Sequence, residues 1–570
     1  MPLQQKRWRF KEIPEKDAKE LCNQLRIDST ICSILASRGI KTFDQAKTFF
    51  RPQLGGLHDP WLMKDMRIAV DRILQAIKQN EKILIYGDYD VDGTTSVAVL
   101  YDFLSFISPT SFIEYYIPDR YKEGYGLSAA GIDYAASHQF SLLITLDCGI
   151  KSVDLIQKAK EKNIDTIVCD HHLPGNSLPP AVAILNAKQP LCNYPFKELC
   201  GCGVGFKLIQ ALCIELGLSN DLYVNYLDLV ATAIAADIVP ITGENRILAF
   251  HGLKKANENP NTGINALLEQ SKIQSSLSIN GLSFVIGPRI NAAGRMGDAK
   301  RAVSLFIEKD FNQAKIIAST LQVENTNRKE ADSSITEEAL EQINLEINFQ
   351  HKKTIVVHNE HWHKGVLGIV ASRLLEKYYR PTIVLTKSGE FYTGSARSIA
   401  GFNIYDALDR CSEFLHAFGG HYFAAGMTIA PQHLSSFIDK FESVANDVLT
   451  ENDMIPEIEI DAAIQLSDLN QSFYNILQQM EPFGPDNTKP IFCVKNAQNI
   501  GCRVVKEEHV RFEIAQDGHI MNGIGFNLAK KYEALNRPNH LDVVFVLDEN
   551  HFNGKTTLQM KVLDFRVSEK

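Results

Sequence analysis

The sequence predicts an α/β chain of several domains: one with a parallel sheet, a helical connector, a smaller α/β domain and a C-terminal β domain. Three observations predict this fold class. A chain of 570 residues is too long for one hydrophobic core. Strand-like and helix-like segments alternate in two separate stretches, as is typical of parallel sheets. The last stretch shows short alternating strands separated by turn residues.

The first alternating stretch, about residues 61–260, follows an N-terminal segment at 1–60. Its apolar runs predict strands, and the amphipathic runs between them predict helices. The helix expected last in this stretch is apolar on nearly every face, so we expect it to be buried. Strands are expected at 82–86, 142–147, 165–170 and 181–186, and helices at 94–106, 153–163, 205–216 and 223–239.

Residues 261–346 are expected to connect the two α/β domains, and the part from 310 onward is polar with a helical period. The second α/β domain is expected at 347–447. Its pattern predicts strands at 353–358 and 381–386 and helices at 365–378 and 402–415.

Residues 456–570 are expected to form the β domain. Four strand patterns begin near residues 455, 490, 511 and 542. Asp-Gly at 517–518 and Asn-Gly at 553–554 interrupt alternating runs, which predicts hairpins in an antiparallel barrel or sandwich.

The composition is that of an ordinary globular protein, with 45% hydrophobic and 22% charged residues. The net charge of -9 argues against a broadly basic coat for nucleic acid, although a local Arg-rich groove is compatible with it. No run is long enough to span a membrane, and no apolar stretch follows the basic N-terminus as in a secretory signal. We therefore expect a cytoplasmic protein without membrane association.

The 11 cysteines are irregularly spaced, as in a reducing compartment. Cys192, Cys200 and Cys202 lie close together in the sequence but lack paired CxxC spacing. We interpret them as structural residues rather than zinc ligands.

Acidic residues and histidines follow the predicted strands of the first domain. Because the carboxyl ends of parallel strands meet at one edge of the sheet, these side chains are expected to lie close together. The set consists of Asp88, Asp90 and Asp92 after the first strand, Asp147 after the next, His171 and His172 after Asp170, and Asp237 at the end of the apolar helix.

So many carboxylates cannot share a desolvated crevice as bare anions, because each raises the pKa of its neighbours. Divalent cations would resolve the conflict, and the mixture of carboxylates with imidazole suits Mn²⁺ or Mg²⁺. Two ions about 3.5 to 4 Å apart would polarise a phosphoryl group and supply hydroxide for in-line attack. A calcium loop is the alternative, but the Glu that it requires after Gly93 is missing. Taken singly, Asp147 could be a turn residue and the histidine pair a solvated loop.

Several motifs together resemble the DHH phosphoesterase superfamily, and specifically its RecJ branch of bacterial single-strand-specific exonucleases. The first four are DYDVDG (88–93), LDCG (146–149), DHH (170–172) and AADIVP (235–240). The later ones are IGPRINAAGRMGDA (286–299), HWHKGVLGIVASRL (361–374), GSARS (394–398) and FGGHYFAAG (418–426). The resemblance implies a DHH domain, a DHHA1 domain and a C-terminal OB-type domain. It also implies 5'-to-3' hydrolysis of single-stranded DNA to 5'-mononucleotides, in recombination and repair.

The resemblance also implies which residues bind the two ions. Asp90 and Asp147 would hold one ion with Asp88 beside them, although Asp88 could instead be a loop carboxylate outside the metal-binding set. His172 would orient its neighbour or approach the substrate. The second ion would be held by Asp92, His171, Asp237 and Asp147, the last acting as the bridge.

In the second domain the resemblance implies a phosphate-binding group. Arg397 offers a bidentate fork, and His421 would donate to the scissile phosphate. The alternatives are a surface ion pair for Arg397 and a core histidine for His421. Gly394, Ser395 and Ser398 would supply close backbone approach and hydroxyl groups. His361 and His363 are poor metal candidates, because the segment after them has the spacing of a helix packed on a sheet.

Two further groups would contact DNA. Arg289, Asn291 and Arg295 resemble the family's DNA-contacting stretch, with helix capping and salt bridging as the alternative. Arg120, with Tyr121 and Tyr125, could line the entry for unpaired bases, and an ordinary surface role is an equally open alternative.

Two rival functions come from other classes. A phosphoesterase of small substrates such as cyclic dinucleotides or pyrophosphate would be shorter and would lack residues 456–570. A non-catalytic DNA-binding scaffold would have lost its metal ligands, which are present here. The resemblance favours single-stranded DNA as substrate, a single-strand-binding protein and a helicase as partners, and a monomer. One departure is Asp486, where the family usually has glycine, and it leaves the geometry of that turn open.

Overall fold

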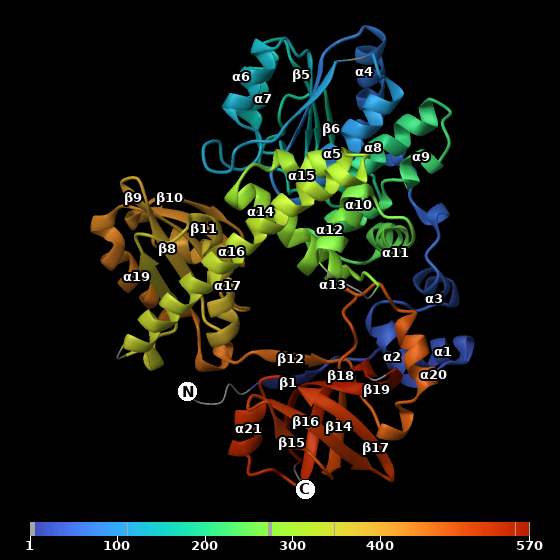
Figure 1. Ribbon diagram of the computed structural model, residues 1–570, viewed down its shortest axis with the longest axis vertical. Helices are drawn as coiled ribbons and strands as arrows, with labels where there is room; N and C mark the ends of the chain where they lie inside the picture. Colours follow the sequence, from blue (N-terminus) through green and yellow to red (C-terminus); the bar gives the residue numbers. More distant parts are fainter. Residues whose placement is uncertain (1–5, 111, 272–275, 347, 553, 569–570) are drawn as a thin grey trace. The chain divides into compact units, whose positions relative to one another are not determined.

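Five parallel strands form the sheet of the first α/β region in the computed structural model (Figure 1), which describes residues 6–110, 112–271, 276–346, 348–552 and 554–568. Along the sheet the order is β3-β2-β4-β5-β6, and every neighbouring pair is parallel. This confirms the predicted fold class of the region. The strands are β2 (Ile83–Gly87), β3 (Ile113–Tyr116), β4 (Leu142–Leu146), β5 (Asp165–Cys169) and β6 (Ala183–Leu185).

Alternation along β2 shows why this segment is a central strand. Ile83 and Ile85 join the larger hydrophobic core on one face of the sheet, whereas Leu84 and Tyr86 join a second core on the other face. A strand buried on both faces must be apolar throughout, as this one is. Helices α4 (Met66–Lys78), α5 (Val91–Ile107), α8 (Gly201–Glu215) and α10 (Leu227–Ala236) contribute to the first core, and α6 (Ala129–Ser137) and α7 (Val153–Glu161) to the second.

The register of the sheet aligns the carboxyl ends of three strands. Gly87 pairs with Leu146, which in turn pairs with Cys169. Asp88, Asp147 and Asp170 each follow one of these residues, so they leave the sheet side by side. The chain passes from β2 to β3 on one side and then to β4 on the other. The edge between β2 and β4 is therefore a topological switch point, where ligands bind in sheets of this kind.

The chain divides into two compact units. Unit 2 comprises residues 40–326 and 477–489, and unit 1 comprises residues 1–39, 327–476 and 490–570. The predicted domain boundaries remain a prediction, since both units include parts of more than one predicted domain. The other helices of residues 40–326 are α3 (Phe43–Phe50), α9 (Asp221–Val224), α11 (Gly243–Glu258), α12 (Thr262–Ser271), α13 (Ile279–Gly281), the π-helix η3 (Leu282–Ile286), α14 (Gly287–Met296) and α15 (Lys300–Ile307).

The predicted polar connector helix is confirmed as α16 (Phe311–Leu345), a single helix of 35 residues. After it, unit 1 contains the second α/β sheet, with strand order β10-β11-β9-β8-β7. Only the β7–β8 pair is parallel in this sheet. The elements are β7 (Ile355–Asn359), α17 (Leu367–Tyr378), β8 (Thr382–Ser388), β9 (Phe391–Arg397), α18 (Ile404–Asp409), β10 (Leu415–Gly420), β11 (Ala424–Ile429) and α19 (Leu434–Val448).

The C-terminal strands form a seven-stranded sheet in the order β13-β14-β18-β19-β17-β16-β15, and an additional β14–β16 pairing closes it. The predicted Asp-Gly hairpin is present: Asp517 and Gly518 both have positive φ, as a two-residue turn requires. Asn553, of the other predicted hairpin, lies outside the described residues. The elements are β13 (Ala462–Ala463), α20 (Gln471–Gln478), β14 (Phe492–Asn499), β15 (Arg503–Val505), β16 (His509–Gln516), β17 (His519–Gly525), α21 (Ala529–Ala534), β18 (His540–Phe552) and β19 (Lys555–Val567).

One strand lies elsewhere than predicted. The segment IPEIEI was expected in the β domain sheet, but its strand β12 (Glu457–Ile460) pairs in parallel with β1 (Arg7–Phe10). The reason is electrostatic as well as geometric, because Arg9 on β1 pairs with both Glu457 and Glu459 on β12. Helices α1 (Glu15–Leu25) and α2 (Ser29–Ser37) follow β1.

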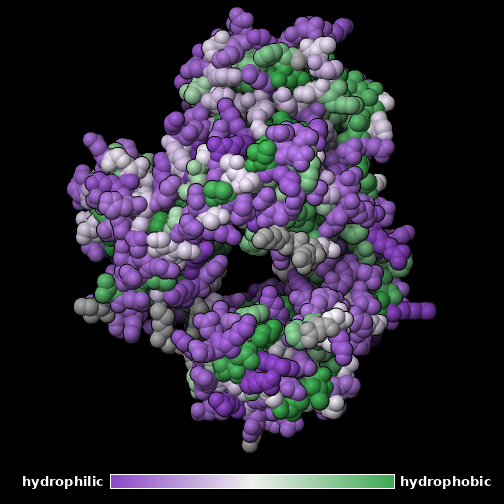
Figure 2. Space-filling model, viewed as in Figure 1, coloured by the Kyte–Doolittle hydropathy of each residue, from purple (hydrophilic) through white to green (hydrophobic). Residues whose placement is uncertain are grey.

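The surface visible in Figure 2 is mainly hydrophilic, with hydrophobic residues scattered between polar ones. Within the described residues, no helix combines the length and the apolar character needed to cross a bilayer.

Candidate active site

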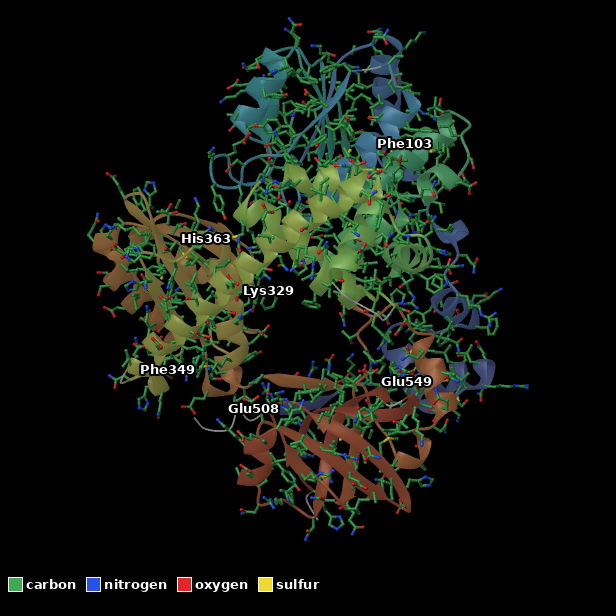
Figure 3. All side chains as sticks on the ribbon, in the orientation of Figure 1. Phe103, Lys329, Phe349, His363, Glu508 and Glu549 are labelled. Atoms are coloured by element: carbon green, nitrogen blue, oxygen red, sulfur yellow. The ribbon has the colours of Figure 1, made fainter. Side chains whose placement is uncertain are left out.

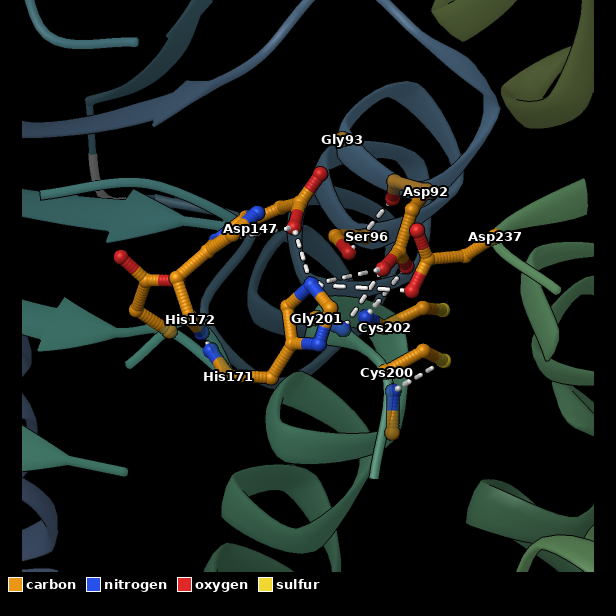
Figure 4. Close-up of polar contacts among 12 residues, drawn as sticks. Asp92, Gly93, Ser96, Asp147, His171, His172, Cys200, Gly201, Cys202 and Asp237 are labelled. Carbon is orange, nitrogen blue, oxygen red and sulfur yellow. Dashed lines mark hydrogen bonds and ion pairs between the residues drawn. The ribbon is translucent and has the colours of Figure 1, made fainter. Parts of the chain in front are cut away.

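The side chains at the switch point converge on one imidazole (Figure 4). Nε2 of His171 lies 3.1 Å from Oδ1 of Asp147, 3.6 Å from Oδ2 of Asp237 and 3.8 Å from Oδ2 of Asp92. Asp92 is on α5, Asp147 directly follows β4, His171 lies two positions after β5, and Asp237 directly follows α10. The tertiary structure therefore brings together residues that are up to 145 positions apart in sequence (92 to 237).

Asp92 is held by the amino end of helix α8. Its two carboxylate oxygens accept hydrogen bonds from the backbone N–H groups of Gly201 and Cys202, at 2.6 and 2.7 Å. Gly201 also lets Asp147 lie close to the start of α8, because a Cβ there would lie 2.6 Å from Cβ of Asp147. The partial positive charge of a helix N-terminus stabilises a buried carboxylate at this position.

Asp90 caps helix α5, which begins at Val91, three residues earlier than predicted. Its Oδ1 accepts from the N–H of Gly93 at 3.0 Å. Because of this cap, Asp92 lies in the first turn of the helix rather than in a loop. Asp88 is fully buried, and its Oδ1 accepts from the N–H of Gly126 at 3.0 Å.

His172 is oriented by a residue that was not among the predicted site residues. Oδ1 of the buried Asp170 accepts a hydrogen bond from Nδ1 of His172 at 2.7 Å, and it also accepts from both backbone N–H groups of His171 and His172. On the other side of the ring, Nε2 lies 3.1 Å from the hydroxyl of Tyr125. The position of Asp170 at a strand end, directly before two histidines, was the signal available in the sequence.

Burial and mutual repulsion raise the pKa values of the clustered acids. Burial, followed by the charge of Asp90, raises the pKa of Asp88 to about 8 and that of Asp92 to about 7. The pKa of Asp237 rises to about 9, from burial and then from Asp92. The pKa of Asp147 is also raised well above its usual value, first by burial and then by Asp92. The cluster thus resists carrying its full negative charge.

The two histidines shift in opposite directions. Burial lowers the pKa of His171 to about 3, so this imidazole is neutral and available as a metal ligand. Burial also opposes the charged form of His172, but the hydrogen bond and charge of Asp170 outweigh it and raise the pKa.

The donor atoms fit divalent metal. Two groups have donor atoms mutually within 4.8 Å: Asp92, His171 and Asp237, and Asp147 with His171 and His172. Within the described residues, buried atoms of three site residues have no hydrogen-bond partner. These atoms are Oδ1 of Asp147, Oδ2 of Asp88 and Nε2 of His171. Buried polar atoms are rarely left without a partner, and bound cations would supply partners here.

Of the two predicted sets of metal ligands, the set with His171 is brought together more closely than the set with Asp88 and Asp90. Asp92, His171 and Asp237 form a group, and Asp147 lies against the same imidazole. Among the described residues, Asp88 and Asp90 do not form such a group with Asp147. The cysteines near the site are not part of either group. Sγ of Cys200 accepts from the N–H of Gly203 and so caps α8.

Around the segment Asp88–Asp92 lie several residues predicted to contact DNA. The guanidinium of Arg120 lies 4.8 Å from the centre of the Tyr89 ring, and its charge lowers the pKa of Asp88 against the larger effect of burial. The hydroxyl of Tyr121 donates to the backbone carbonyl of Arg295. Asn291 and Arg295 are half-buried on α14.

Arg289 differs from the prediction. Its guanidinium is buried, with Nε donating to Gln322 at 2.8 Å and Nη1 donating to the carbonyl of Val285. These hydrogen bonds pack the side chain between α14 and α16, and they are neither the helix cap nor the salt bridge of the alternative.

The GSARS segment lies on β9, where strand alternation separates its residues. Nη1 of Arg397 donates to Oγ of Ser395 at 2.9 Å, so these two side chains share a face. Ser398 is buried and donates to the carbonyl of Phe402 at 2.6 Å, which removes it from that group. Gly394 has a packing role, since a Cβ there would lie 2.3 Å from a methyl group of Leu385.

The two alternatives for the phosphate-binding residues do not fit. Arg397 is half-buried and makes no ion pair with a described residue, so it is not a surface ion pair. His421 is exposed in the turn between β10 and β11, so it is not a core histidine. His363, labelled in Figure 3, caps the turn before α17 by accepting from the N–H of Gly365.

Three family models match the chain. They are described as the DHH family, N-terminal domain, at residues 82–234, the DHHA1 domain at 351–447, and the RecJ OB domain at 460–564. The second and third confirm the predicted DHHA1 and OB-type folds.

Relatives match over nearly the whole chain. The single-stranded-DNA-specific exonuclease RecJ of Bacillus subtilis is 37% identical over 568 residues, covering 99% of this chain and 71% of the relative. The crystal structure of RecJ from Thermus thermophilus with Mn²⁺ is similar with a TM-score of 0.85 and 27% identity, covering 99% of this chain and 80% of that one. The same protein with Mg²⁺ has a TM-score of 0.79 and 26% identity, covering 99% and 79%.

Proposed function

This chain belongs to the RecJ family of single-stranded-DNA-specific exonucleases, and from that premise we propose that it degrades single-stranded DNA stepwise from the 5' end and releases 5'-mononucleotides. The observation that carries the proposal is the convergence of Asp92, Asp147, His171 and Asp237, with buried donor atoms that lack partners among the described residues. We place the activity in DNA recombination and repair.

The cofactor in this proposal is a pair of Mn²⁺ or Mg²⁺ ions, the metals found with the Thermus thermophilus relative. Asp92, Asp147, His171 and Asp237 would hold one ion, and Asp88, Asp90 and Asp147 the other. Bound there, the ions would neutralise the carboxylates, polarise the scissile phosphoryl group and activate water for in-line attack.

The protein's own residues then orient the substrate. The carboxylate of Asp170 accepts from Nδ1 of His172 and raises the pKa of the ring, and the imidazolium so favoured would donate from Nε2, on the side of Tyr125, to the scissile phosphate. Arg120, Asn291 and Arg295 would contact the DNA strand near the segment Asp88–Asp92. On unit 1, Ser395, Arg397 and the exposed His421 would bind phosphate oxygens, whereas Ser398, Gly394 and Arg289 are assigned structural roles.

Partners and location are proposed on the family alone. We propose a monomer that works with a helicase and a single-strand-binding protein. A cytoplasmic location follows from the substrate, because the DNA of the bacteria in which the relatives occur lies there.

The test uses end-labelled single-stranded and duplex DNA with the purified chain and Mn²⁺. We expect mononucleotide release from the 5' end of single strands only, and its loss in Asp147→Ala. Equal digestion of duplex, release from the 3' end, or unchanged activity of the variant would overturn the proposal. Hydrolysis of cyclic dinucleotides or pyrophosphate instead of DNA would favour the small-substrate phosphoesterases.

A further inference from the structure

A short segment far along the chain packs onto the unit that contains the metal-binding residues. Residues 477–489 run from the end of α20 to shortly before β14, and they belong to the same compact unit as residues 40–326. Within the segment, Leu477, Met480 and Asn487 are almost completely buried. The segment contacts α11 and the loop before it.

Arg246 on α11 forms the first attachment. Its buried guanidinium donates to the backbone carbonyls of Glu481 and Pro482, at 2.8 and 3.3 Å, and to that of Phe49 at 2.8 Å. It also lies 3.9 Å from the centre of the Phe49 ring. A buried cation is costly unless its donors are satisfied, so the segment and Arg246 hold each other in place.

The loop that follows Asp237 forms the second attachment. The N–H of Ile241 donates to the carbonyl of Pro485 at 2.8 Å. Gly484 packs so closely that a Cβ there would lie 2.5 Å from Cγ1 of the fully buried Ile241. The turn itself is rigid, because Gly484 and Asn487 exchange two backbone hydrogen bonds. Asp486 adopts a φ of 57°, the left-handed conformation that glycine takes freely and Asp tolerates.

The loop needs such support because its backbone is strained. Ile238, directly after Asp237, has a φ of 59°. A β-branched residue is strained in this region and persists only where the surroundings hold it. Side-chain support on the other side comes from Asn245, which donates to the carbonyl of Pro240 at 3.1 Å.

We propose that residues 477–489 are an intramolecular latch that holds Asp237 in position for metal binding. The inference deepens the proposed function and rests on it for the identity of the reaction. It names Arg246 and Gly484 as positioning residues, which touch neither substrate nor metal.

The test compares Gly484→Ala with Gly55→Ala, a matched change in the same unit at a glycine whose Cβ would meet nothing within 4 Å. Mn²⁺ binding to the metal-free full chain is measured by calorimetry, and the Mn²⁺ concentration for half-maximal activity is measured on a dinucleotide and on a long single strand. We expect Gly484→Ala to weaken Mn²⁺ binding about 10–100-fold and to raise the half-activating concentration equally on both substrates. Gly55→Ala should behave as the unmodified chain.

A second variant, Arg246→Lys, keeps the charge but loses the fork that binds the carbonyls, so it should shift Mn²⁺ binding in the same direction. It decides the question if Gly484→Ala does not fold. Unchanged Mn²⁺ binding in a folded latch variant, or a loss restricted to the long strand, would overturn the latch. If the unmodified chain bound Mn²⁺ but did not cut DNA, the proposed function would fail while calorimetry still tested the latch.

Discussion

Nε2 of His171 lies 3.1 Å from Oδ1 of Asp147, and neither atom makes a hydrogen bond within the described part of the chain. The two atoms are close enough to share a cation and are poorly placed to satisfy each other. Unfolding of the protein with and without Mn²⁺ can therefore show whether these two atoms bind the metal.

Asp147→Asn should abolish metal stabilisation without unfolding the protein. The amide keeps the shape of the carboxyl group but removes the charge that a divalent cation requires. For the unmodified chain we expect Mn²⁺ at about 100 times its dissociation constant to add about 2.7 kcal/mol to the free energy of unfolding. The variant should show no such gain in thermal unfolding, while exposed Asp154→Asn should gain fully. An equal stabilisation of both variants by Mn²⁺ would show that Asp147 is not a metal ligand.

Without metal, the stability of the protein should fall as pH rises. Asp92, Asp88 and Asp237 have pKa values raised to about 7, 8 and 9, so the folded state holds their protons more tightly than the unfolded state. Stability is then greatest below the ordinary Asp pKa of about 4 for these groups and is lost progressively up to about pH 9. Unfolding midpoints in a chelator from about pH 5 to about pH 9 test this. A midpoint that rises over this range without metal would contradict it, and Mn²⁺ should flatten the fall.

Asp170→Asn should reduce turnover through the orientation of His172. The amide can no longer act as the charged acceptor for Nδ1 of His172, at present 2.7 Å away. We expect kcat to fall about 10–100-fold, the usual cost of losing a partner that orients a site residue, with little change in KM. The pH profile of kcat should also move, which a purely structural defect would not cause. An unchanged kcat and profile would show that Asp170 is dispensable.

Arg397→Ala should weaken DNA binding in a salt-dependent way. If Arg397 neutralises one phosphate, its loss should reduce the slope of log affinity against log salt by about 0.7 for a single strand. Fluorescence anisotropy with labelled oligonucleotide measures the slope. Arg410→Ala is the control, because Arg410 forms an exposed ion pair with Asp447 on the same unit. Equal slopes for all three proteins would exclude the phosphate contact.

Arg289→Ala and Arg295→Ala should separate stability from binding. Loss of Arg289 removes two hydrogen bonds from a charged group to the half-buried Val285 and Gln322, so the free energy of unfolding should fall by about 1–3 kcal/mol. Loss of Arg295 should instead raise KM for DNA with little change in stability. Chemical unfolding and steady-state kinetics on both variants test this pair, and the reverse pattern would restore Arg289 as the DNA contact.

Much of the fold followed from local patterns. Apolar runs ending in Asp marked β2, β4 and β5, because a strand buried on both faces must be apolar and the chain turns polar where it leaves the sheet. Helix α16 was likewise predictable, because its sequence is polar and has a helical period. The pairing of β12 with β1 was not, because it joins residues about 450 positions apart through charges that no local pattern reveals.

The site shows the same division. The sequence by itself determined the strand ends, the acids and histidines that follow them, and the need for a cation among so many carboxylates. Only the tertiary structure decided that Asp170 orients His172, that Arg289 and Ser398 point into packing, and that residues 477–489 contact the loop that follows Asp237. The physical reason is range: backbone periodicity is set by neighbouring residues, whereas hydrogen-bond partners and close packing depend on which distant surfaces the folded chain brings together.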